Sequence, residues 1–314
     1  MAKLGYIQII RQCNQSCLFC SSPETGQIRS LKDVVVIVDD YIKEKIDGVV
    51  LTGGEPTLHP KLNDILKYCQ NKGLEVRLIT NAQKLSDYEY LKKLVLNGLD
   101  LVHISVHSIN PKVQDLLSNN KGSLKRIVRS LVNAKKLKLP VYINMVINSL
   151  NCKTIDKNIN FFIRSFPEIK HFIINNIDAE ENRASENKFL VPKFADIKKS
   201  LNKALDVLSK SNKTFRIEMV PLCYMSKYAD CSTETRKIVK DEARILNFLD
   251  KRNKPHLIQN KGSFRYDYAP QCNNCTLKTI CAGVHGLNDY FDSKELIPQT
   301  MKPDIIINKI LNNG

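Results

Sequence analysis

Short β-rich runs alternate with amphipathic segments along the first part of the chain. Branched aliphatic residues dominate the runs, and six of them are predicted to be strands: Leu4–Ile10, Gly48–Leu51, Glu75–Thr80, Leu101–Val106, Val141–Ile147 and His171–Asn175. The segments between them carry apolar residues at i, i+3, i+4 and i+7, which predicts helices. These helices lie near 31–46, 60–72, 86–97, 123–138 and 154–166. Serial alternation of strands and helices predicts an α/β fold with parallel strands and right-handed crossovers.

Three architectures fit this alternation: a full barrel, an open doubly wound sheet, and a partial barrel of about six units. A full barrel is disfavoured because eight units would need more regular chain than is left. A further helix is predicted from Pro192 to about Lys210, followed by a strand at Thr214–Val220.

After Pro221 the regular pattern breaks down. A helix near 233–249 is expected, and then a hairpin in which His256–Gln259 and Phe264–Tyr268 flank a turn. We therefore predict two regions, a barrel-like region at 1–220 and a small C-terminal extension at 221–314.

Composition places the chain among globular proteins, with 314 residues, 43% hydrophobic and 25% charged. The longest aliphatic stretch, Val34–Val38, is far shorter than the ~18 apolar residues of a membrane span. The N-terminal residues show no apolar signal core, so we expect a cytoplasmic location and no membrane partner. The net charge of +16 suits nucleic acid or an acidic partner. The lysines are scattered along the chain and no RNA-binding motif occurs, so the charge alone identifies no partner.

Cysteine is the first residue type that points to chemistry, because ten occur and most are clustered. Clustered thiols in a reducing compartment indicate metal or redox chemistry. Cys13, Cys17 and Cys20 form a C-x3-C-x2-C run after the first predicted strand. Three thiolates from one loop can hold three irons of a cubane cluster and leave the fourth iron open. Zinc binding or accidental thiols are the alternatives at this point.

A second motif, Thr52-Gly53-Gly54-Glu55-Pro56, ends the second predicted strand. Glycines at the carboxyl end of a parallel strand permit close backbone approach to a ligand, and ligands bind at this end of parallel sheets. Glu55 adds a carboxylate that can meet a ligand ammonium. Taken alone, the motif is equally typical of a turn that begins a helix.

Together the two motifs resemble the signature of the radical S-adenosylmethionine (SAM) superfamily, in which an aromatic residue, here Phe19, precedes the last cysteine. The resemblance covers roughly residues 4–178 and implies a partial (β/α)6 barrel with a [4Fe-4S] cluster at Cys13, Cys17 and Cys20. It further implies that the amino and carboxylate groups of SAM chelate the open iron. A reduced cluster would then cleave the sulfonium to a 5′-deoxyadenosyl radical, which abstracts a hydrogen atom from substrate.

The same resemblance implies a set of SAM-contacting residues: Phe19, Gly53, Gly54, Glu55, Ser105 and Asn144. The glycines and the glutamate would hold the methionyl ammonium, and the aromatic ring would lie near the adenine. For Ser105 a small residue inside the barrel is an alternative of nearly equal weight, and for Asn144 and Asn81 the structural alternative is heavier.

The second cysteine cluster, Cys272, Cys275 and Cys281, has the spacing C-x2-C-x5-C. It is similar to the twitch or SPASM-like auxiliary-cluster extensions of the superfamily, which implies a second [4Fe-4S] cluster. The fourth ligand has to come from upstream, and we expect Cys223, directly after the last strand, rather than Cys231. Zinc bound by the same four thiolates is the alternative.

The thiol that is not a ligand, Cys223 or Cys231, is a candidate hydrogen-atom donor, since the radical peptide epimerases of the superfamily use such a cysteine. We accordingly expect an enzyme that modifies a ribosomally made peptide by epimerisation, thioether formation or another crosslink. A flavodoxin- or ferredoxin-like protein would supply single electrons. The alternatives are radical modification of a small molecule or tRNA and, outside enzymes, an iron–sulfur electron carrier or a zinc-binding module.

Overall fold

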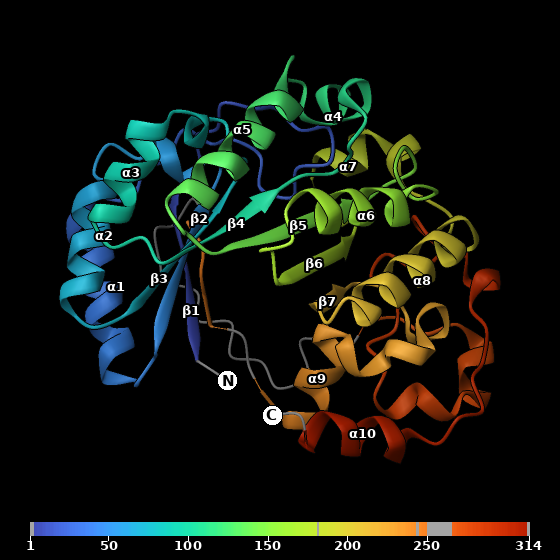
Figure 1. Cartoon of the computed structure of the whole chain (residues 1–314). Coiled ribbons are helices and arrows are strands. Elements are labelled where there is room, and N and C mark those ends of the chain that lie inside the picture. Colours follow the sequence, from blue (N-terminus) through green and yellow to red (C-terminus); the bar gives the residue numbers. More distant parts are fainter. Residues whose placement is uncertain (1–2, 181, 243–244, 250–265, 313–314) are drawn as a thin grey trace. The chain divides into compact units, whose positions relative to one another are not determined.

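The computed structural model describes residues 3–180, 182–242, 245–249 and 266–312, and the chain divides into two compact units (Figure 1). Unit 1 comprises Met1–Cys17, Ser22–Ile143 and Arg244–Gln259. Unit 2 comprises Leu18–Ser21, Asn144–Ala243 and Asn260–Gly314. The predicted boundary after residue 220 is a different division of the chain and stays a prediction.

Eight strands are described: β1 (Leu4–Ile10), β2 (Gly48–Gly53), β3 (Glu75–Thr80), β4 (Leu101–Ser105), β5 (Val141–Ile147), β6 (His171–Asn176), β7 (Thr214–Glu218) and β8 (Ile245–Asn247). Their order is β7-β6-β5-β4-β3-β2-β1-β8. The pairs β1–β2, β2–β3, β3–β4, β6–β7 and β1–β8 are all parallel. The predicted fold class, an α/β chain of the partial (β/α)6 type, is confirmed.

The α-helices of the described residues are α1 (Leu31–Lys43), α2 (Leu62–Asn71), α3 (Tyr88–Leu96), α4 (Pro111–Ser118), α5 (Ser123–Lys136), α6 (Ile155–Ser165), α7 (Arg183–Glu186), α8 (Phe194–Lys210), α9 (Thr233–Lys240) and α10 (Pro303–Asn312). Several begin where a side chain accepts an orphan backbone N–H. Ser30 accepts from Asp33 at the start of α1, and Asp87 accepts from Tyr90 at the start of α3. None of the helices in the described part of the chain is long and apolar enough to cross a membrane.

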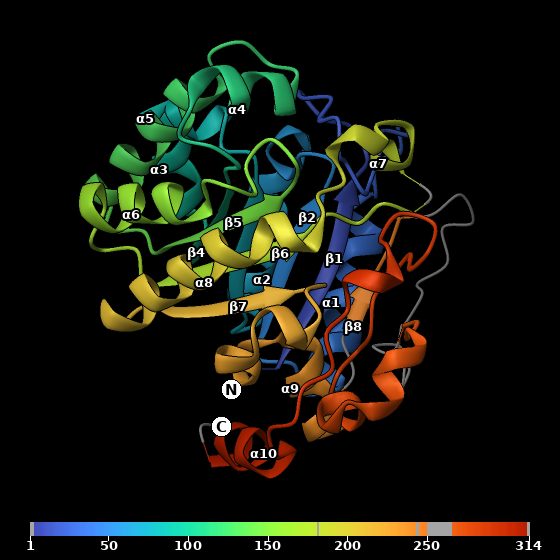
Figure 2. The same ribbon diagram turned by 90° about the vertical axis from the view of Figure 1, so that its right-hand side faces the viewer.

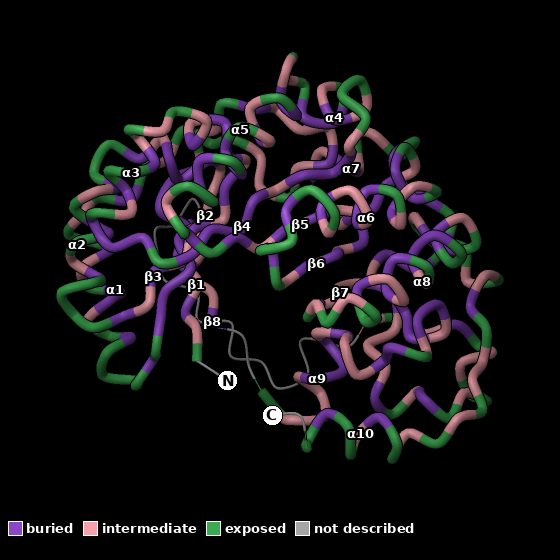
Figure 3. Tube along the Cα trace, viewed as in Figure 1, coloured by how far each residue is buried: buried purple, intermediate pink, exposed green. Residues whose placement is uncertain are grey.

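In unit 1 the strands β2 and β4 are buried over most of their length, whereas β3 alternates between buried and half-buried residues (Figure 3). The first four residues of β2 and of β4 are buried, which fits the near-continuous aliphatic runs of parallel strands. Helices α1, α2 and α3 lie along one side of these strands (Figure 1). The carboxyl ends of β1 to β3 lead into the segments that carry the predicted site.

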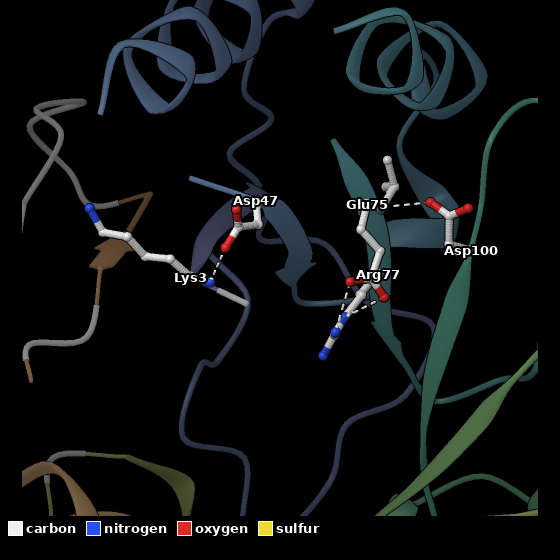
Figure 4. Close-up of polar contacts among 6 residues, drawn as sticks. Lys3, Asp47, Glu75, Arg77 and Asp100 are labelled. Atoms are coloured by element: carbon white, nitrogen blue, oxygen red, sulfur yellow. Dashed lines mark hydrogen bonds and ion pairs between the residues drawn. The ribbon is translucent and has the colours of Figure 1, made fainter. Parts of the chain in front are cut away.

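Polar contacts fix the opposite, amino ends of the strands (Figure 4). The backbone N–H of Lys3 donates to Asp47 Oδ2 at 2.6 Å, and the N–H of Val76 donates to Asp100 Oδ2 at 2.7 Å. On β3, Arg77 donates two hydrogen bonds to Glu75, at 3.0 and 2.8 Å. The first two bonds satisfy backbone N–H groups at the strand starts, and the cysteine loop lies at the other end of the sheet.

Unit 2 contains β6, β7 and the helices that pack on them. Ser200 of α8 donates to Asp156 Oδ1 of α6 at 2.8 Å and accepts the backbone N–H of Asp156, which joins the two helices. A second apolar cluster lies in the C-terminal part: Leu222, Ala229, Leu277, Ile280, Ile306 and Ile310. This cluster ties α10 to the segments that carry the C-terminal cysteines.

The helix predicted near 233–249 is wrong in its second half, because α9 ends at Lys240. Asp241 adopts a left-handed conformation with φ 51°, which ends the helix. Residues 245–247 instead form β8, which pairs with β1 within unit 1 (Figure 2). The predicted hairpin at 256–268 lies largely outside the described residues.

Candidate functional site

The cysteine loop, residues 11–30, connects β1 to α1. Cys13 and Cys17 are half-buried free thiols on the part of this loop that belongs to unit 1. Cys20, also half-buried, and Phe19, which is 7% exposed, lie in the four residues assigned to unit 2. The predicted cluster ligands thus share one loop. Their joint binding of a cluster stays a prediction.

Hydrogen bonds from three elements hold the residues between Cys13 and Cys17. Asn14 Oδ1 accepts from Asn81 Nδ2, after β3, at 2.7 Å. Ser16 Oγ lies 2.9 Å from Asn119 Nδ2, at the end of α4.

The third of these contacts is buried. Gln15 Nε2 donates to Ser123 Oγ, the first residue of α5, at 3.2 Å. The same hydroxyl lies 3.3 Å from Gln83 Nε2 and 3.4 Å from Gln114 Nε2. This part of the loop is therefore preorganised by the protein.

The two glycines of the second motif allow backbones to pack together. Gly53 has φ 147°, and a Cβ there would lie 1.9 Å from the Ile10 carbonyl oxygen. A Cβ on Gly54 would lie 2.3 Å from the Gln12 carbonyl oxygen. The N–H of Gly54 donates to the Ile10 carbonyl at 2.7 Å. Both glycines are thus required where β2 meets the root of the cysteine loop.

The carboxylate of Glu55 is fully buried and accepts four hydrogen bonds. Thr57 donates its backbone N–H at 3.1 Å and its hydroxyl at 2.6 Å, Thr80 donates its hydroxyl at 2.7 Å, and Asn81 donates its N–H at 2.8 Å. Burial raises the pKa of Glu55, while these donors favour the ionised form. The carboxylate therefore joins β2 to the end of β3, and a ligand ammonium would have to share its oxygens with these donors.

The other predicted SAM contacts lie at strand positions. Ser105 is the half-buried last residue of β4, at its carboxyl end. Asn144 of β5 is half-buried and accepts a hydrogen bond from Asn175 of β6 at 2.9 Å. Their contact with a cofactor stays a prediction.

Four cysteines of unit 2 line one cavity: Cys223, Cys272, Cys275 and Cys281. Cys223 reaches it from the turn after β7, and the others come from the segment 270–281. Most of the remaining lining is apolar, including Leu277, Leu296 and Ile297. The upstream thiol expected to complete the ligand set is thus beside the other three, and Cys231 does not line this cavity.

Backbone amides donate hydrogen bonds to several of these sulfurs. Gln299 N–H donates to Cys275 Sγ at 3.3 Å, and Gly283 N–H donates to Cys281 Sγ at 3.4 Å. Burial raises the pKa of Cys223 to about 11, and a backbone hydrogen bond from Ile297 opposes that shift. Four thiols with amide donors in an apolar setting fit an iron–sulfur cluster. Among the described residues no three His, Cys, Asp or Glu side chains are grouped closely enough to hold a single metal ion, so cluster ligation stays a prediction at both ends of the chain.

Of the remaining cysteines, Cys69 and Cys152 are buried and Cys231 is half-buried. The Sγ of Cys231 lies 3.8 Å from Asp230 Oδ2, and burial raises the pKa of its thiol to about 12. Cys69 is completely buried in α2, and Cys152 contacts the Ser149 carbonyl at 3.4 Å. The role of Cys223 or Cys231 as a hydrogen-atom donor stays a prediction.

Sequence reasoning gave little weight to Asn81 and none to Gln15. Asn81 lies one residue beyond the predicted strand Glu75–Thr80, at the edge where ligands bind, which was an available signal. Gln15 had no such signal, because its partner Ser123 is 108 positions away.

Residues 7–161 match the sequence model of the Radical SAM superfamily. The chain therefore carries a radical SAM superfamily domain, and the resemblance drawn from the two motifs is confirmed at that level. The matched range contains the end of β1, the cysteine loop, β2 to β5 and the Gly-Gly-Glu motif.

Several curated relatives are named GTP 3′,8-cyclases. The probable GTP 3′,8-cyclase of Sulfurisphaera tokodaii is 28% identical over 216 residues, 67% of this chain and 67% of the relative. That of Sulfolobus acidocaldarius is 33% identical over 172 residues, 53% of this chain and 54% of the relative. The GTP 3′,8-cyclase of Aquifex aeolicus is 31% identical over 154 residues, which are 46% of this chain and 48% of the relative. The chain spans about half to two thirds of the length of these relatives.

Solved structures show a similar fold over nearly the whole chain. Streptococcus suis SuiB bound to SAM has a TM-score of 0.66 at 17% identity and covers 96% of this chain and 77% of its own. The protein anSMEcpe, with bound AdoMet and the Cp18Cys peptide, has a TM-score of 0.65 at 16% identity. The similarity covers 99% of this chain and 96% of anSMEcpe. At such identities the likeness is evidence of fold alone.

Proposed function

We propose that this chain is a radical SAM enzyme that modifies a small molecule, with a purine nucleoside triphosphate such as GTP as the first candidate substrate. The observation that carries the radical SAM part is the cysteine loop itself. Three cysteines follow β1, and the loop is anchored by Gln15 and packed against Gly53 and Gly54. The matched superfamily range includes all of these residues.

The substrate class rests on sequence similarity. Relatives at 28–33% identity are named GTP 3′,8-cyclases, and their aligned segments cover about half to two thirds of this chain. The initial expectation of a peptide substrate has weaker support, because the solved structures that favour it are only 16–17% identical to this chain. Of the substrate classes predicted from the sequence (peptide, small molecule and tRNA), the small molecule is now the best supported.

Peptide modification is retained as the second candidate on one observation. SuiB has been solved bound to the precursor peptide SuiA, with a TM-score of 0.67 to this chain. That similarity of fold extends over 95% of this chain.

When bound, the cluster at Cys13, Cys17 and Cys20 would supply one electron to SAM, and the chain's own residues would hold the reactants and exclude water. The cavity of unit 2 would hold the second cluster through Cys223, Cys272, Cys275 and Cys281.

The experiment is anaerobic incubation of the iron-loaded chain with SAM and dithionite, with and without GTP. We expect 5′-deoxyadenosine in both samples, and GTP consumption in the second. Formation of 5′-deoxyadenosine without GTP loss would reject GTP but keep the radical SAM assignment.

The matched control replaces Cys13, Cys17 and Cys20 with alanine and leaves the unit 2 cysteines intact. This variant should release no 5′-deoxyadenosine while it keeps the iron bound by unit 2. Continued SAM cleavage by the triple variant would refute the proposed mechanism.

A further inference from the structure

The side chain of Asn81 faces a cysteine of the predicted cluster in a fixed orientation. Its Oδ1 accepts the backbone N–H of Gln83 at 3.1 Å, and its Nδ2 lies 2.7 Å from Asn14 Oδ1 and 3.7 Å from Cys13 Sγ. A backbone N–H can only donate, so the Gln83 contact assigns the amide oxygen to that side. The amide nitrogen therefore points at the sulfur.

The backbone of Asn81 is fixed as well. Its N–H donates to the buried carboxylate of Glu55 at 2.8 Å, and its carbonyl accepts from Gln83 Nε2 at 3.0 Å. With the main chain and both ends of the side-chain amide engaged, the N–H direction is set by the fold rather than by a bound ligand.

An N–H aimed at a thiolate stabilises negative charge on the sulfur. Reduction of an iron–sulfur cluster adds one electron, part of whose charge falls on the cysteine sulfurs. The hydrogen bond is therefore stronger in the reduced form, and hydrogen bonds to sulfur are one of the means by which proteins set cluster potentials.

We propose that Asn81 is a positioning residue that raises the reduction potential of the N-terminal cluster through its hydrogen bond to Cys13. The inference rests on the proposed function, because it requires that Cys13 be a cluster ligand.

The test is the midpoint potential of the N-terminal cluster in the full iron-loaded chain, followed by electron paramagnetic resonance during titration with dithionite. The signal that changes when SAM is added is assigned to this cluster. Asn81→Leu removes the donor at similar volume and should disfavour reduction about tenfold, ~59 mV for a one-electron couple. Asn81→Asp keeps an acceptor for the N–H of Gln83, so it is the variant to use if Asn81→Leu does not fold. Its negative charge beside Cys13 should lower the midpoint potential below that of Asn81→Leu.

Two matched controls separate the amide from loop anchoring. Asn14→Ala removes the other acceptor of the same amide but leaves the N–H facing Cys13. Asn119→Gly removes the anchor of Ser16, at a left-handed position that suits glycine. Both should keep the wild-type potential.

The inference would be overturned if both Asn81 variants kept the wild-type midpoint potential. It would also be overturned if the two control variants lowered the potential as much as the Asn81 variants do. A wild-type chain that takes up no iron through Cys13, Cys17 and Cys20 would instead reject the proposed function.

Discussion

The buried carboxylate of Glu55 accepts four hydrogen bonds, two from Thr57 and two from Thr80 and Asn81 at the end of β3, which makes it a sensitive residue in unit 1. In Glu55→Gln one carboxylate oxygen becomes an NH2 group, which would face either the N–H of Asn81 or the donors of Thr57 and Thr80. We expect a loss of about 1–3 kcal/mol in the free energy of unfolding, measured by urea denaturation. Affinity for SAM, measured separately, should fall too if the carboxylate meets the ligand ammonium. An unchanged unfolding free energy would show that the four bonds contribute little.

His107, two residues after the end of β4, is 5% exposed, and burial lowers its pKa to about 4 from 6.5. The unfolded chain therefore binds a proton at this residue below pH 6.5, whereas the folded chain does so only near pH 4. Its contribution to stability is complete above pH 6.5 and is lost as the pH falls toward 4.

The loss should approach about 1.4 kcal/mol per pH unit within that window. We expect His107→Gln to flatten this part of the curve of unfolding free energy against pH. Identical slopes for the variant and the wild type would assign the acid sensitivity to other groups.

At the scale of elements, the N-terminus of α5 supports the cysteine loop through Ser123, whose hydroxyl lies near the amides of Gln15, Gln83 and Gln114. Ser123→Ala should cost about 1–3 kcal/mol, because buried amide donors lose an acceptor. Ser118→Ala in α4 is the matched control, since its buried hydroxyl bonds to carbonyls of its own helix. The prediction fails if the two variants unfold at the same urea concentration.

The turn after β7 decides which thiol completes the cysteine set of unit 2. Cys223 lines the cavity with the three C-terminal cysteines, whereas Cys231 lies against Asp230. We expect Cys223→Ala to lose about one cluster per chain by iron analysis, and Cys231→Ala to keep full iron. Full iron with stalled product formation in Cys223→Ala would instead make Cys223 a hydrogen-atom donor.

Element positions were predictable where hydrophobic period and burial agree. The observed β1, β3 and β5 have the predicted bounds, because runs rich in β-branched and aliphatic residues span each of them. Helix α4 was not predicted, although Asn110 caps it and Pro111 begins it, because its eight residues are too few for a clear period. Strand β8 was missed because three residues acquire strand structure only through pairing with β1, far away in sequence.

The candidate site likewise contains residues that the sequence could identify and contacts that it could not. Spacing identified the cysteines and the Gly-Gly-Glu motif, because those ligands and glycines are close in sequence. It could not show that Glu55 is enclosed by Thr57, Thr80 and Asn81, since the fold brings those donors together.

For the whole molecule, the net charge of +16 becomes informative once a substrate class is proposed. A nucleoside triphosphate is strongly anionic, so the positive field of the protein should raise its rate of encounter. SAM carries a net positive charge from its sulfonium and ammonium groups, so the same field does not attract it. The two small molecules should therefore respond differently to salt.

The last prediction uses that difference. Raising the ionic strength from ~10 mM to ~150 mM shortens the Debye length from about 30 Å to about 8 Å. We expect kcat/KM for GTP to fall several-fold over this range, while the rate of 5′-deoxyadenosine release without GTP at saturating SAM stays nearly constant. Both rates can be measured on the same iron-loaded preparation, so loss of cluster at high salt would appear in the second rate as well. A kcat/KM for GTP that does not depend on salt would show that the basic charge is not used in substrate capture, and would favour a neutral or cationic substrate.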